Sequence, residues 1–476
     1  MAVRESDCCI VPMRRGNARR GKAATTLSFL LGKHALHTGV GEDMETVLAR
    51  IAEIARNKPE EKFTSLYHHI NVELLLKCHR EIPANKAAGV DQVTKADYAA
   101  NLKENLHDLV ERLKQWSYRP QPVRRAHIPK GDGKTMRPLG ILAYEDKLVQ
   151  LALTKLLEPI FEQDFLSLSY GFRPDRSCHD ALKELNRIIE KGRINYVVDA
   201  DIKGFFDHVN HEWLMKCLEQ RIADPNIKRL ITRLLKAGIM EDGKWEPSEE
   251  GTVQGGSISP LMANIYLHFV LDLWFERVVK KNCRGEAEII RYCDDFVCCF
   301  QYKEDAEKFY TELKQRLAKF GLEIAEEKSK LLAFGRFAEA NCKKKGMRKP
   351  DTFDFLGFTH YCSKSRSGYF RVKRKTSRKK FIAKVKAFKL WIQKARHQDI
   401  KDIWEIVHLK LNGHYRYYGI TDNSEMLHRY GFEIRKLLFK WLNRRSQRRS
   451  YNYAEFNDYL KWNPLPEPRI YVNIYG

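Results

Sequence analysis

Two adjacent aspartates, Asp294 and Asp295, stand between two apolar runs at residues 289–292 and 296–300. The branched and aromatic residues of these runs favour strands, whereas aspartate favours turns, so the stretch predicts a β-hairpin with acid at its tip. A turn exposed to water explains one aspartate more easily than two. Two carboxylates held side by side repel each other, and a divalent cation is the usual reason for tolerating that repulsion.

A second acidic position is predicted at residues 195–201, which have the composition of a strand. The alternation of side chains along a strand puts Asp199 and Asp201 on the same face. Asp201, at the end, is best placed to meet Asp294 and Asp295 if the two strands are neighbours in one sheet. Three converging carboxylates suit two Mg²⁺ ions, one activating a 3′-hydroxyl and one stabilising a leaving pyrophosphate during in-line phosphoryl transfer.

Another hairpin is predicted at residues 126–141, where two β-prone segments flank a Gly-Asp-Gly turn. Lys130 and Arg137 lie on its two arms and would face each other across the hairpin. Two cations in that arrangement could hold a triphosphate, because phosphate oxygens accept charge-assisted hydrogen bonds from both side-chain types. A basic hairpin exposed to water is the alternative interpretation.

Two loops have compositions that suit contact with a nucleotide or a template strand. Residues 169–177 hold Arg173 and Arg176 beside two aromatic rings, and such a loop could contact phosphates and bases. Residues 251–260 are rich in glycine and run into a predicted long helix capped by Ser259. Exposed amides at such a place can approach a nucleotide, although a purely structural role is the alternative.

The net charge of +24 implies a polyanionic partner, either nucleic acid or an anionic membrane surface. The sequence contains no apolar run of the roughly 18 residues that a transmembrane helix needs, which favours nucleic acid. The 11 cysteines lack the paired spacing of a zinc site, and reduced thiols in an intracellular, cytoplasmic protein are expected. Hydrophobic residues make up 43% of the chain, as in a folded protein.

Most of the excess charge lies at residues 361–450, with about 25 lysines and arginines against about 6 acids. Aromatic residues interleave with these cations, which indicates helices with a packed side and a phosphate-binding side, and structured RNA as partner. Basic surface helices without a partner are the alternative. The cations expected to contact RNA, besides the two loop arginines, are Lys373, Arg374, Lys375, Arg378, Lys379, Arg416, Arg444, Arg445 and Arg448.

Taken in this order, the motifs resemble those of reverse transcriptases, most closely the group II intron reverse transcriptases that also act as maturases. The resemblance covers the chain from about residue 60 to its last residues. It rests partly on four segments, residues 85–91, 127–141, 170–177 and 411–419. It also rests on four short motifs, which are Asp201-Ile202-Lys203-Gly204-Phe205-Phe206-Asp207, Gln254-Gly255-Gly256-Ser257-Ile258-Ser259-Pro260, Tyr292-Cys293-Asp294-Asp295 and Phe355-Leu356-Gly357-Phe358.

The resemblance implies an α+β chain with a right-hand polymerase fold, in which fingers, a palm with an antiparallel sheet and a helical thumb follow one another. We expect a basic arm and first helix at residues 1–57 and fingers at 58–192. The palm is expected at 193–362 and an RNA-binding thumb, or maturase domain, at 363–476. Within the fingers, we expect Gly89 to supply backbone freedom to the loop at 85–91.

The resemblance also implies roles for individual residues. Asp201, Asp294 and Asp295 would be the catalytic metal ligands, holding two Mg²⁺ ions for which Mn²⁺ may substitute. Phe206 would exclude a 2′-hydroxyl and so select deoxynucleotides. The residues expected to bind the incoming nucleotide are Lys130, Arg137 and Gln254, and those expected to support the primer end are Phe355, Leu356, Gly357 and Phe358.

The implied function is RNA-directed DNA synthesis from dNTPs on an RNA template with a DNA primer, together with binding of the intron RNA in splicing and of a DNA target in mobility. A splicing-only maturase and a domesticated reverse transcriptase in phage defence or RNA spacer acquisition are the alternatives. Cys293 stands where the family most often has alanine, and we expect activity to survive because the side chain stays small. The sequence shows no His- and Cys-bearing endonuclease module, so we expect another source of primer.

Overall fold

The structure, a computed structural model, describes residues 43–129, 136–344, 346, 349–445 and 450–475. Helices and β-sheets are both present, as the α+β prediction requires. The chain divides into two compact units that interleave along the sequence. The first unit comprises the described residues of Met1–Ala126, Leu139–Leu166 and Gly204–Val278, and the second those of His127–Pro138, Ser167–Lys203 and Val279–Gly476. The division into fingers, palm and thumb stays a prediction.

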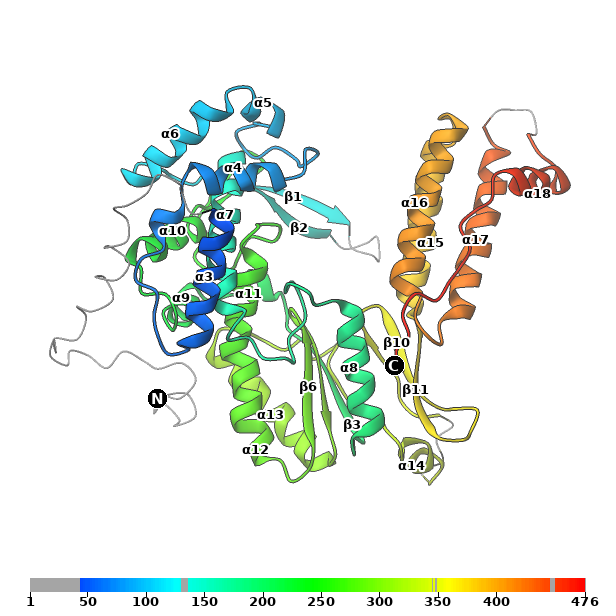
Figure 1. Ribbon diagram of the computed structural model, residues 1–476. Helices are drawn as coiled ribbons and strands as arrows, with labels where there is room; N and C mark the ends of the chain where they lie inside the picture. The colour runs from blue at the N-terminus through cyan, green and yellow to red at the C-terminus, as the bar shows by residue number, and fades with distance from the viewer. Residues whose placement is uncertain (1–42, 130–135, 345, 347–348, 446–449, 476) are drawn as a thin grey trace. The chain divides into compact units, whose positions relative to one another are not determined.

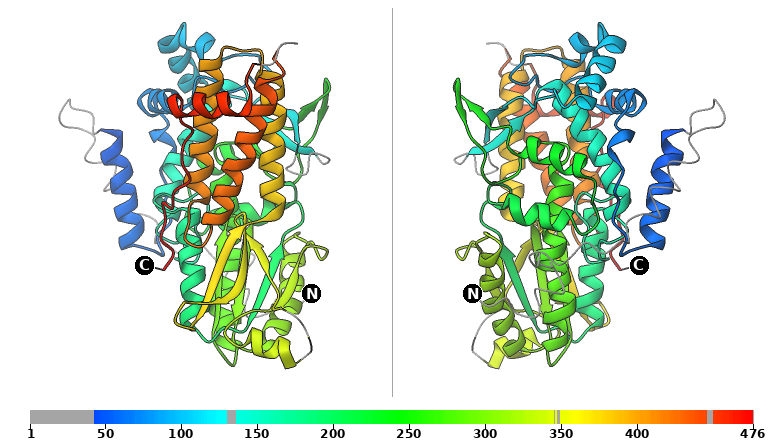
Figure 2. Two further views of the ribbon diagram at one scale, coloured as in Figure 1. Left: turned by 90° about the vertical axis from the view of Figure 1, so that its right-hand side faces the viewer. Right: turned by 90° about the vertical axis from the view of Figure 1, so that its left-hand side faces the viewer.

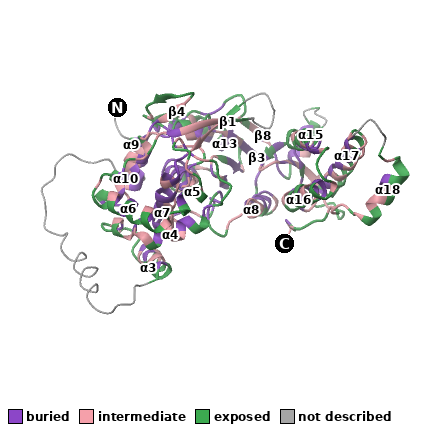
Figure 3. Cartoon of the chain, turned by 90° about the horizontal axis from the view of Figure 1, so that it is seen from above, coloured by how far each residue is buried: buried purple, intermediate pink, exposed green. Residues whose placement is uncertain are grey.

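The first unit is built around the helix α7 (Tyr144–Phe161). Most of its residues are buried, and Figure 3 shows buried positions gathered along it. Helices α3 (Met44–Asn57), α4 (Val72–Glu81) and α11 (Ser259–Leu267) contact it. The unit's other helices are η1 (Tyr67–His69), α5 (Lys95–Ala99), α6 (Leu102–Lys114), η2 (Phe205–Asp207), α9 (His211–Leu218), α10 (Pro225–Leu235) and the π-helical η3 (His268–Asp272).

A four-stranded sheet with the order β2-β1-β4-β5 contains the predicted basic hairpin. Its strands are β1 (Val123–Pro129), β2 (Met136–Ile141), β4 (Ile239–Glu241) and β5 (Lys244–Glu246). The hairpin prediction is confirmed for the two arms, whereas the turn and Lys130 lie outside the described residues. The tip of the hairpin, His127–Pro138, is part of the second unit.

Two local expectations for the first unit are wrong. Ser259 is the first residue of α11 rather than its cap, because the capping position is occupied by Ile258, which makes no side-chain cap. Gly89 does not adopt a left-handed conformation. A Cβ at Gly89 would lie 2.5 Å from backbone atoms of Ala143, so close packing of two chain segments requires this glycine.

The second unit contains an antiparallel sheet with the order β6-β7-β3-β8. Its strands are β6 (Ala287–Tyr292), β7 (Asp295–Phe300), β3 (Tyr196–Asp201) and β8 (Lys330–Ala333). This confirms the predicted acidic hairpin and the strand before it. Helix α8 (Cys178–Lys191) packs on β6, as Figure 1 shows, and α13 (Lys303–Lys319) packs on β3 and β7.

Three further strands and a set of long helices complete the second unit. Strands β9 (Phe353–Phe355), β10 (Phe358–Lys364) and β11 (Phe370–Thr376) form an antiparallel sheet. Figures 1 and 2 show α15 (Arg378–Ala395), α16 (Ile400–Tyr418) and α17 (Ser424–Leu442) side by side. The remaining helices are α14 (Ala338–Lys344) and α18 (Tyr453–Trp462), while η4 (Phe275–Val279) and α12 (Lys280–Asn282) link the two units in the sequence.

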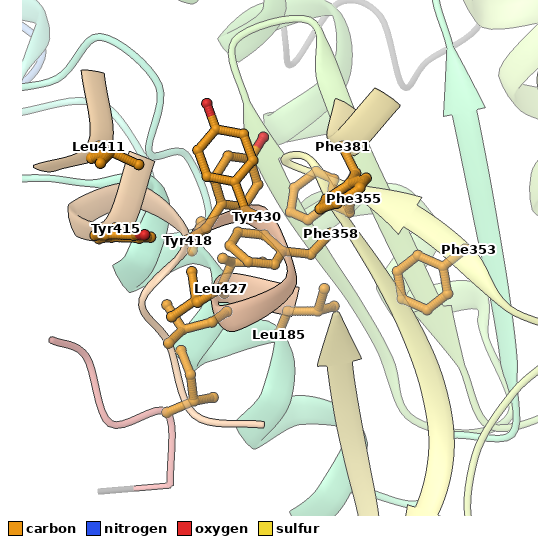
Figure 4. Packing of buried hydrophobic residues seen from close by; sticks show 14 of the residues in the cluster. Leu185, Phe353, Phe355, Phe358, Phe381, Leu411, Tyr415, Tyr418, Leu427 and Tyr430 are labelled. Carbon is orange, nitrogen blue, oxygen red and sulfur yellow. The ribbon is translucent and has the colours of Figure 1, made fainter. Parts of the chain in front are cut away.

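One hydrophobic core joins these parts of the second unit. It takes side chains from α8, from the sheets and from α15, α16 and α17, and Figure 4 shows Phe355, Phe358, Tyr418 and Tyr430 packed within it. The aromatic residues of the basic region are therefore largely core residues, which confirms that its helices have a packed side. Among the described residues, no helix is long and apolar enough to cross a bilayer.

His414 is a buried histidine that makes the stability of the second unit depend on pH. Its ring stacks on Tyr430 with centroids 3.6 Å apart, and among the described residues neither ring nitrogen has a hydrogen-bond partner. Burial, with a smaller effect from the charge of Lys384, lowers the pKa of His414 to about 3. The unfolded chain therefore binds a proton that the folded chain excludes, and stability falls as the pH drops below about 6.5.

We expect the His414 contribution to cost about 2 kcal/mol of unfolding free energy on going from pH 7.5 to pH 5. His414→Phe keeps an aromatic ring against Tyr430 and removes the titrating group, so its stability should change less over the same interval. Urea unfolding at both pH values, followed by tryptophan fluorescence, measures the difference. An unchanged pH dependence in the variant would show that His414 is not responsible.

Candidate active site

The acidic residues lie at the tip of a tight hairpin in the second unit. Tyr292 and Asp295 form the last pair between β6 and β7, which leaves Cys293 and Asp294 as a two-residue turn. Cys293 has a φ of 59°, the left-handed conformation that short hairpin turns demand and that side chains rarely adopt. The hairpin tip thus presents Asp294 in the turn and Asp295 at the start of β7, the two carboxylates predicted at this position.

Strand β3 brings a third carboxylate to this tip. It pairs with β7 so that Asp201 lies directly opposite Asp295, which confirms that the two acidic strands are neighbours. Directly opposite residues of an antiparallel pair have Cβ atoms about 5 Å apart. Asp199 lies two residues before Asp201 and therefore shares its face of the sheet.

The carboxylates of this region destabilise one another's charged forms. Desolvation, followed by the charges of Asp199, Asp294 and Asp201, raises the pKa of Asp295 to about 7, although part of its surface reaches solvent. Desolvation and then the charges of Asp354 and Asp201 raise the pKa of Asp199 to about 7. The pKa of Asp294 is also raised, mainly by desolvation. A bound cation would relieve this repulsion.

Lys328 supplies a positive charge to this cluster. Its Nζ lies 2.7 Å from Oδ2 of Asp201. The segment that carries Lys328 also holds the backbone of Asp201, whose N–H donates to Oγ of Ser329 and whose carbonyl accepts from the N–H of Ala325. The sequence analysis missed Lys328, because its signal is only a polar run after a predicted helix.

The donor set suits a hard divalent cation, since such ions prefer carboxylate oxygens. Among the described residues, however, no three acidic, histidine or cysteine side chains converge as tightly as a metal centre requires. Asp201 points its Oδ2 at Lys328 instead. The residues present therefore fit a divalent ion in their chemistry, and coordination by Asp201 requires its carboxylate to release the Lys328 ammonium group.

A fully buried arginine supports the strained turn. Arg291 in β6 donates from Nη1 to the carbonyl of Cys293 at 2.9 Å. Its backbone pairs with the segment before Gly171, through the N–H of Arg291 to Leu168 and the N–H of Tyr170 to Arg291. The sequence signal for Arg291 is a charged residue inside an apolar strand, which the sequence analysis did not use.

Gly171 lets its loop lie directly against the acidic turn of Cys293 and Asp294. A Cβ at this position would lie 2.4 Å from the backbone nitrogen of Cys293. We expect Gly171→Ala to push the turn away from the loop and lower the rate of primer extension at least about tenfold, because sub-ångström placement of catalytic groups controls rate. Single-turnover extension of a DNA primer on an RNA template measures the effect.

Cys293→Ala is the matched control at the other side of this contact. It keeps the backbone strain of the turn and a small side chain, so its extension rate should stay within about twofold of the original. Equal rates for Gly171→Ala and Cys293→Ala would contradict the proposed role of the close contact.

A second strained turn lies at Leu356 and Gly357, between β9 and β10. The pair Phe355 and Phe358 closes it, and both turn residues have positive φ values of 49° and 82°. Tyr417 of α16 donates its hydroxyl hydrogen to the carbonyl of Leu356 at 2.9 Å. The residues predicted to support a primer end therefore form a hairpin tip that Tyr417 of α16 holds through a hydrogen bond.

A groove of about 820 Å³ connects the two turns with the helices of the second unit. Asp295 and the Leu356–Gly357 turn line it at one side. Its basic residues are Lys380 and Lys384 of α15 and Lys410 of α16. Aromatic residues of α16 and α17 complete its walls, so the groove offers both charge and ring surface to a nucleic-acid strand.

The residues predicted to bind the incoming nucleotide are divided between the units. Arg137 is exposed in β2 and belongs to the second unit. Its positive charge lowers the pKa of Asp294, but desolvation raises that pKa by more. Phe206 and Gln254 belong to the first unit. There, the N–H of Thr252 donates to the carbonyl of Phe206 at 2.7 Å, which ties the segment of Phe206 to the loop of Gln254.

Comparisons with known proteins agree with this arrangement. Residues 128–360 match the family model described as reverse transcriptase (RNA-dependent DNA polymerase). Over 232 residues the chain is 39% identical to Group II intron-encoded protein LtrA of Lactococcus lactis subsp. cremoris, covering 48% of this chain and 38% of the relative. Over 201 residues it is 40% identical to Protein YkfC of Escherichia coli (strain K12), covering 42% and 52%.

Residues 128–360 of the chain are therefore similar to reverse transcriptases, and the chain is also similar to a group II intron-encoded protein. A further relative is Nuclear intron maturase 1, mitochondrial, of Arabidopsis thaliana, with 34% identity over 95 residues, or 20% of this chain and 13% of the relative. The matched segment covers 38% of the Lactococcus protein and 52% of the Escherichia coli protein. Divalent metal ions are the general requirement of this family's polymerase domain, in agreement with the acidic cluster.

Two of the arginines expected to contact RNA are buried, so the prediction is wrong for them. Arg374 is fully buried and donates to Oδ1 of Asn186 and to the carbonyl of Val372. Arg173 is buried and donates to the carbonyl of Ser169. Of the other candidates, Arg448 lies outside the described residues, and the ones with exposed or partly exposed side chains are Arg176, Lys373, Lys375, Arg378, Lys379, Arg416, Arg444 and Arg445.

Proposed function

We propose that this protein is an RNA-directed DNA polymerase that copies RNA into DNA and also binds its group II intron RNA to assist splicing and mobility. The observation that carries the proposal is the pairing of Asp201 opposite Asp295, beside Asp294, in a segment that matches reverse transcriptases. Clustered carboxylates that raise one another's pKa values are a costly arrangement, and polymerase chemistry gives them a use.

Asp201, Asp294 and Asp295 would hold two Mg²⁺ ions, with Mn²⁺ able to substitute. When bound, these ions would activate the primer 3′-hydroxyl and stabilise the charge of the leaving pyrophosphate. Before they bind, Lys328 keeps Asp201 paired and lowers the repulsion within the cluster. Its side chain is 63% exposed, so water can take up the ammonium group when Asp201 turns to a metal ion.

We propose that the basic hairpin binds the triphosphate of the incoming nucleotide. Arg137, whose charge is felt by Asp294, is suited to a triphosphate, and Lys130 on the opposite arm would assist it. We assign Gln254 to the lining of the nucleotide pocket. Phe206, partly exposed beside this loop, would exclude a 2′-hydroxyl and so favour dNTPs.

The primer strand would lie in the groove that ends at the acidic turn. Lys380, Lys384 and Lys410 provide charge for its phosphates, and the rigid Leu356–Gly357 turn is suited to fix its 3′ end near Asp295. In this proposal the sheet of β3, β6 and β7 is the palm of a right-hand fold. Helices α15, α16 and α17 are its thumb and, with their exposed cations, the surface for intron RNA.

Asp294→Asn tests the assignment of the catalytic centre with little change in shape. We expect primer extension on an RNA template to fall about a thousandfold or more, because an amide is a poor ligand for a hard cation. Binding of the same RNA should remain within about twofold, since Asp294 carries no contact to phosphate. Extension assays with dNTPs and Mg²⁺, together with fluorescence anisotropy, measure the two quantities.

Asp351→Asn is the matched control, because Asp351 is exposed and makes no hydrogen bond or ion pair with any described residue. It should extend primers at the original rate. Near-normal extension by Asp294→Asn would remove Asp294 from the catalytic centre.

A further inference from the structure

Three arginines of the first unit gather around one tryptophan, outside the residues assigned above. The guanidinium carbons of Arg229 and Arg233 in α10 lie 4.4 and 5.1 Å from the ring centroid of Trp116. Arg119 follows Trp116 by three residues and donates to its carbonyl at 2.7 Å. The sequence analysis gave none of these four residues a role.

Backbone carbonyls fix two of the guanidinium groups. Nη1 of Arg119 donates to the carbonyls of Trp116 and Tyr118 at 2.7 and 3.1 Å. Nη1 of Arg233 donates to the same two carbonyls at 3.2 and 3.1 Å. Each group uses one nitrogen for these bonds, so its other N–H groups remain available to an acceptor. The cluster is therefore held in place before any partner binds.

Trp116 itself is held in an unusual conformation by its neighbours. Its φ is 59°, and its ring stacks on Tyr67 with centroids 5.1 Å apart and an angle of 11° between the planes. Because Tyr67 stacks on the indole and the guanidinium groups lie over it, the ring serves as a platform for the arginines.

No carboxylate neutralises the three arginines within the part of the chain that the structure describes. None of them forms an ion pair there, and Asp224, which lies near Tyr67, already accepts four backbone N–H bonds. Desolvation and then the charges of Arg119 and Arg229 lower the pKa of Arg233. Three neighbouring like charges without a counter-ion are destabilising, and an anionic partner would offset this cost.

We propose that Arg119, Arg229 and Arg233 form a site for the phosphate backbone of RNA. This inference rests on the proposed RNA-binding function and adds a contact in the first unit that is separate from the polymerase groove. Arginine suits phosphate because its planar fork donates two parallel hydrogen bonds to phosphate oxygens. Arg229 and Arg233 lie over the ring of Trp116 and Arg119 bonds its backbone carbonyl, so the three groups suit neighbouring phosphates of a strand.

A neighbouring groove favours RNA as the occupant. Trp116 and Tyr67 also line a groove of about 840 Å³ that carries Ser65, His68 and Asn71. Hydroxyl and amide side chains commonly contact sugars and phosphates, so a strand bound at the arginines would find further partners there. The carboxylates of Glu73, Glu111 and Asp224 also line this groove and repel phosphate, whereas none of the three arginines lines it, so we place the phosphates at the arginines.

The test measures binding of a 40-nucleotide RNA hairpin with a fluorescent 5′ end, in the absence of primer and dNTPs. For Arg119→Gln/Arg229→Gln we expect the Kd at 150 mM salt to rise about tenfold or more. The slope of log Kd against log salt concentration should fall by about 2, because two phosphate contacts are lost. Arg229→Gln alone removes no hydrogen bond to the described protein and should reduce the slope by about 1, which guards against misfolding of the double variant.

Lys58→Gln/Lys77→Gln is the matched control in the same unit. It removes two positive charges that already pair with Glu61 and Glu45, so its Kd and salt dependence should stay near the original. Arg119→Lys/Arg229→Lys keeps the charge and loses the fork, so it should recover the slope but only part of the affinity. All variants should keep their melting temperature within a few degrees.

An arginine variant that binds the hairpin with the original Kd and slope would overturn the proposal. So would an equal loss in the paired-lysine control, which would indicate general charge rather than a site. If 10 mM inorganic phosphate at constant ionic strength abolished the difference between variant and original, the site would take free phosphate instead. Failure of the proposed polymerase function would appear separately, because the unsubstituted protein would then not extend a primer. If the unsubstituted protein did not bind the RNA hairpin at all, both proposals would be wrong.

Discussion

Like charges held close together at the end of β3 and the tip of the β6–β7 hairpin are the constraint on which the second unit depends. Asp201 and Asp295 are fixed opposite each other by strand pairing, so neither can move away without breaking the sheet. The backbone hydrogen bonds of β3, β6 and β7 and the core beneath them must therefore offset the repulsion. Lys328 relieves part of it at Asp201, and a divalent ion would relieve more.

Strained backbone at two turns follows from the same requirement. Cys293 and Leu356 both adopt left-handed conformations that cost of order 1 kcal/mol for a residue with a side chain. Each turn has a side chain that holds its carbonyl, Arg291 for Cys293 and Tyr417 for Leu356. Both supports come from residues that are buried or half-buried in the core of the unit, so a packed scaffold holds the acidic turn and the Leu356–Gly357 turn in place.

The sequence predicts the parts of this site that depend on local pattern. The acidic hairpin and the strand ending at Asp201 follow from alternation and turn chemistry. What it does not predict depends on tertiary contacts. Lys328 contacts Asp201 and Arg291 contacts Cys293 only because folding brings these residues together. Arg374 lies in the basic region of the sequence, but its side chain is buried against Asn186. Gly89 is needed for close packing against Ala143 rather than for its own conformation. The roles of Phe206 and Gln254 come from family resemblance and stay predictions.

Cleavage of the chain by bound iron tests the central claim most directly, because it reports where a divalent ion sits without depending on activity. Fe²⁺ in place of Mg²⁺, with ascorbate and peroxide, generates hydroxyl radicals that cut the backbone next to the ion. The account predicts cuts clustered near residue 201 and near residues 293–295, both suppressed by excess Mg²⁺. Cleavage confined to other segments, or cuts at these positions that Mg²⁺ does not suppress, would contradict a shared metal site of Asp201, Asp294 and Asp295.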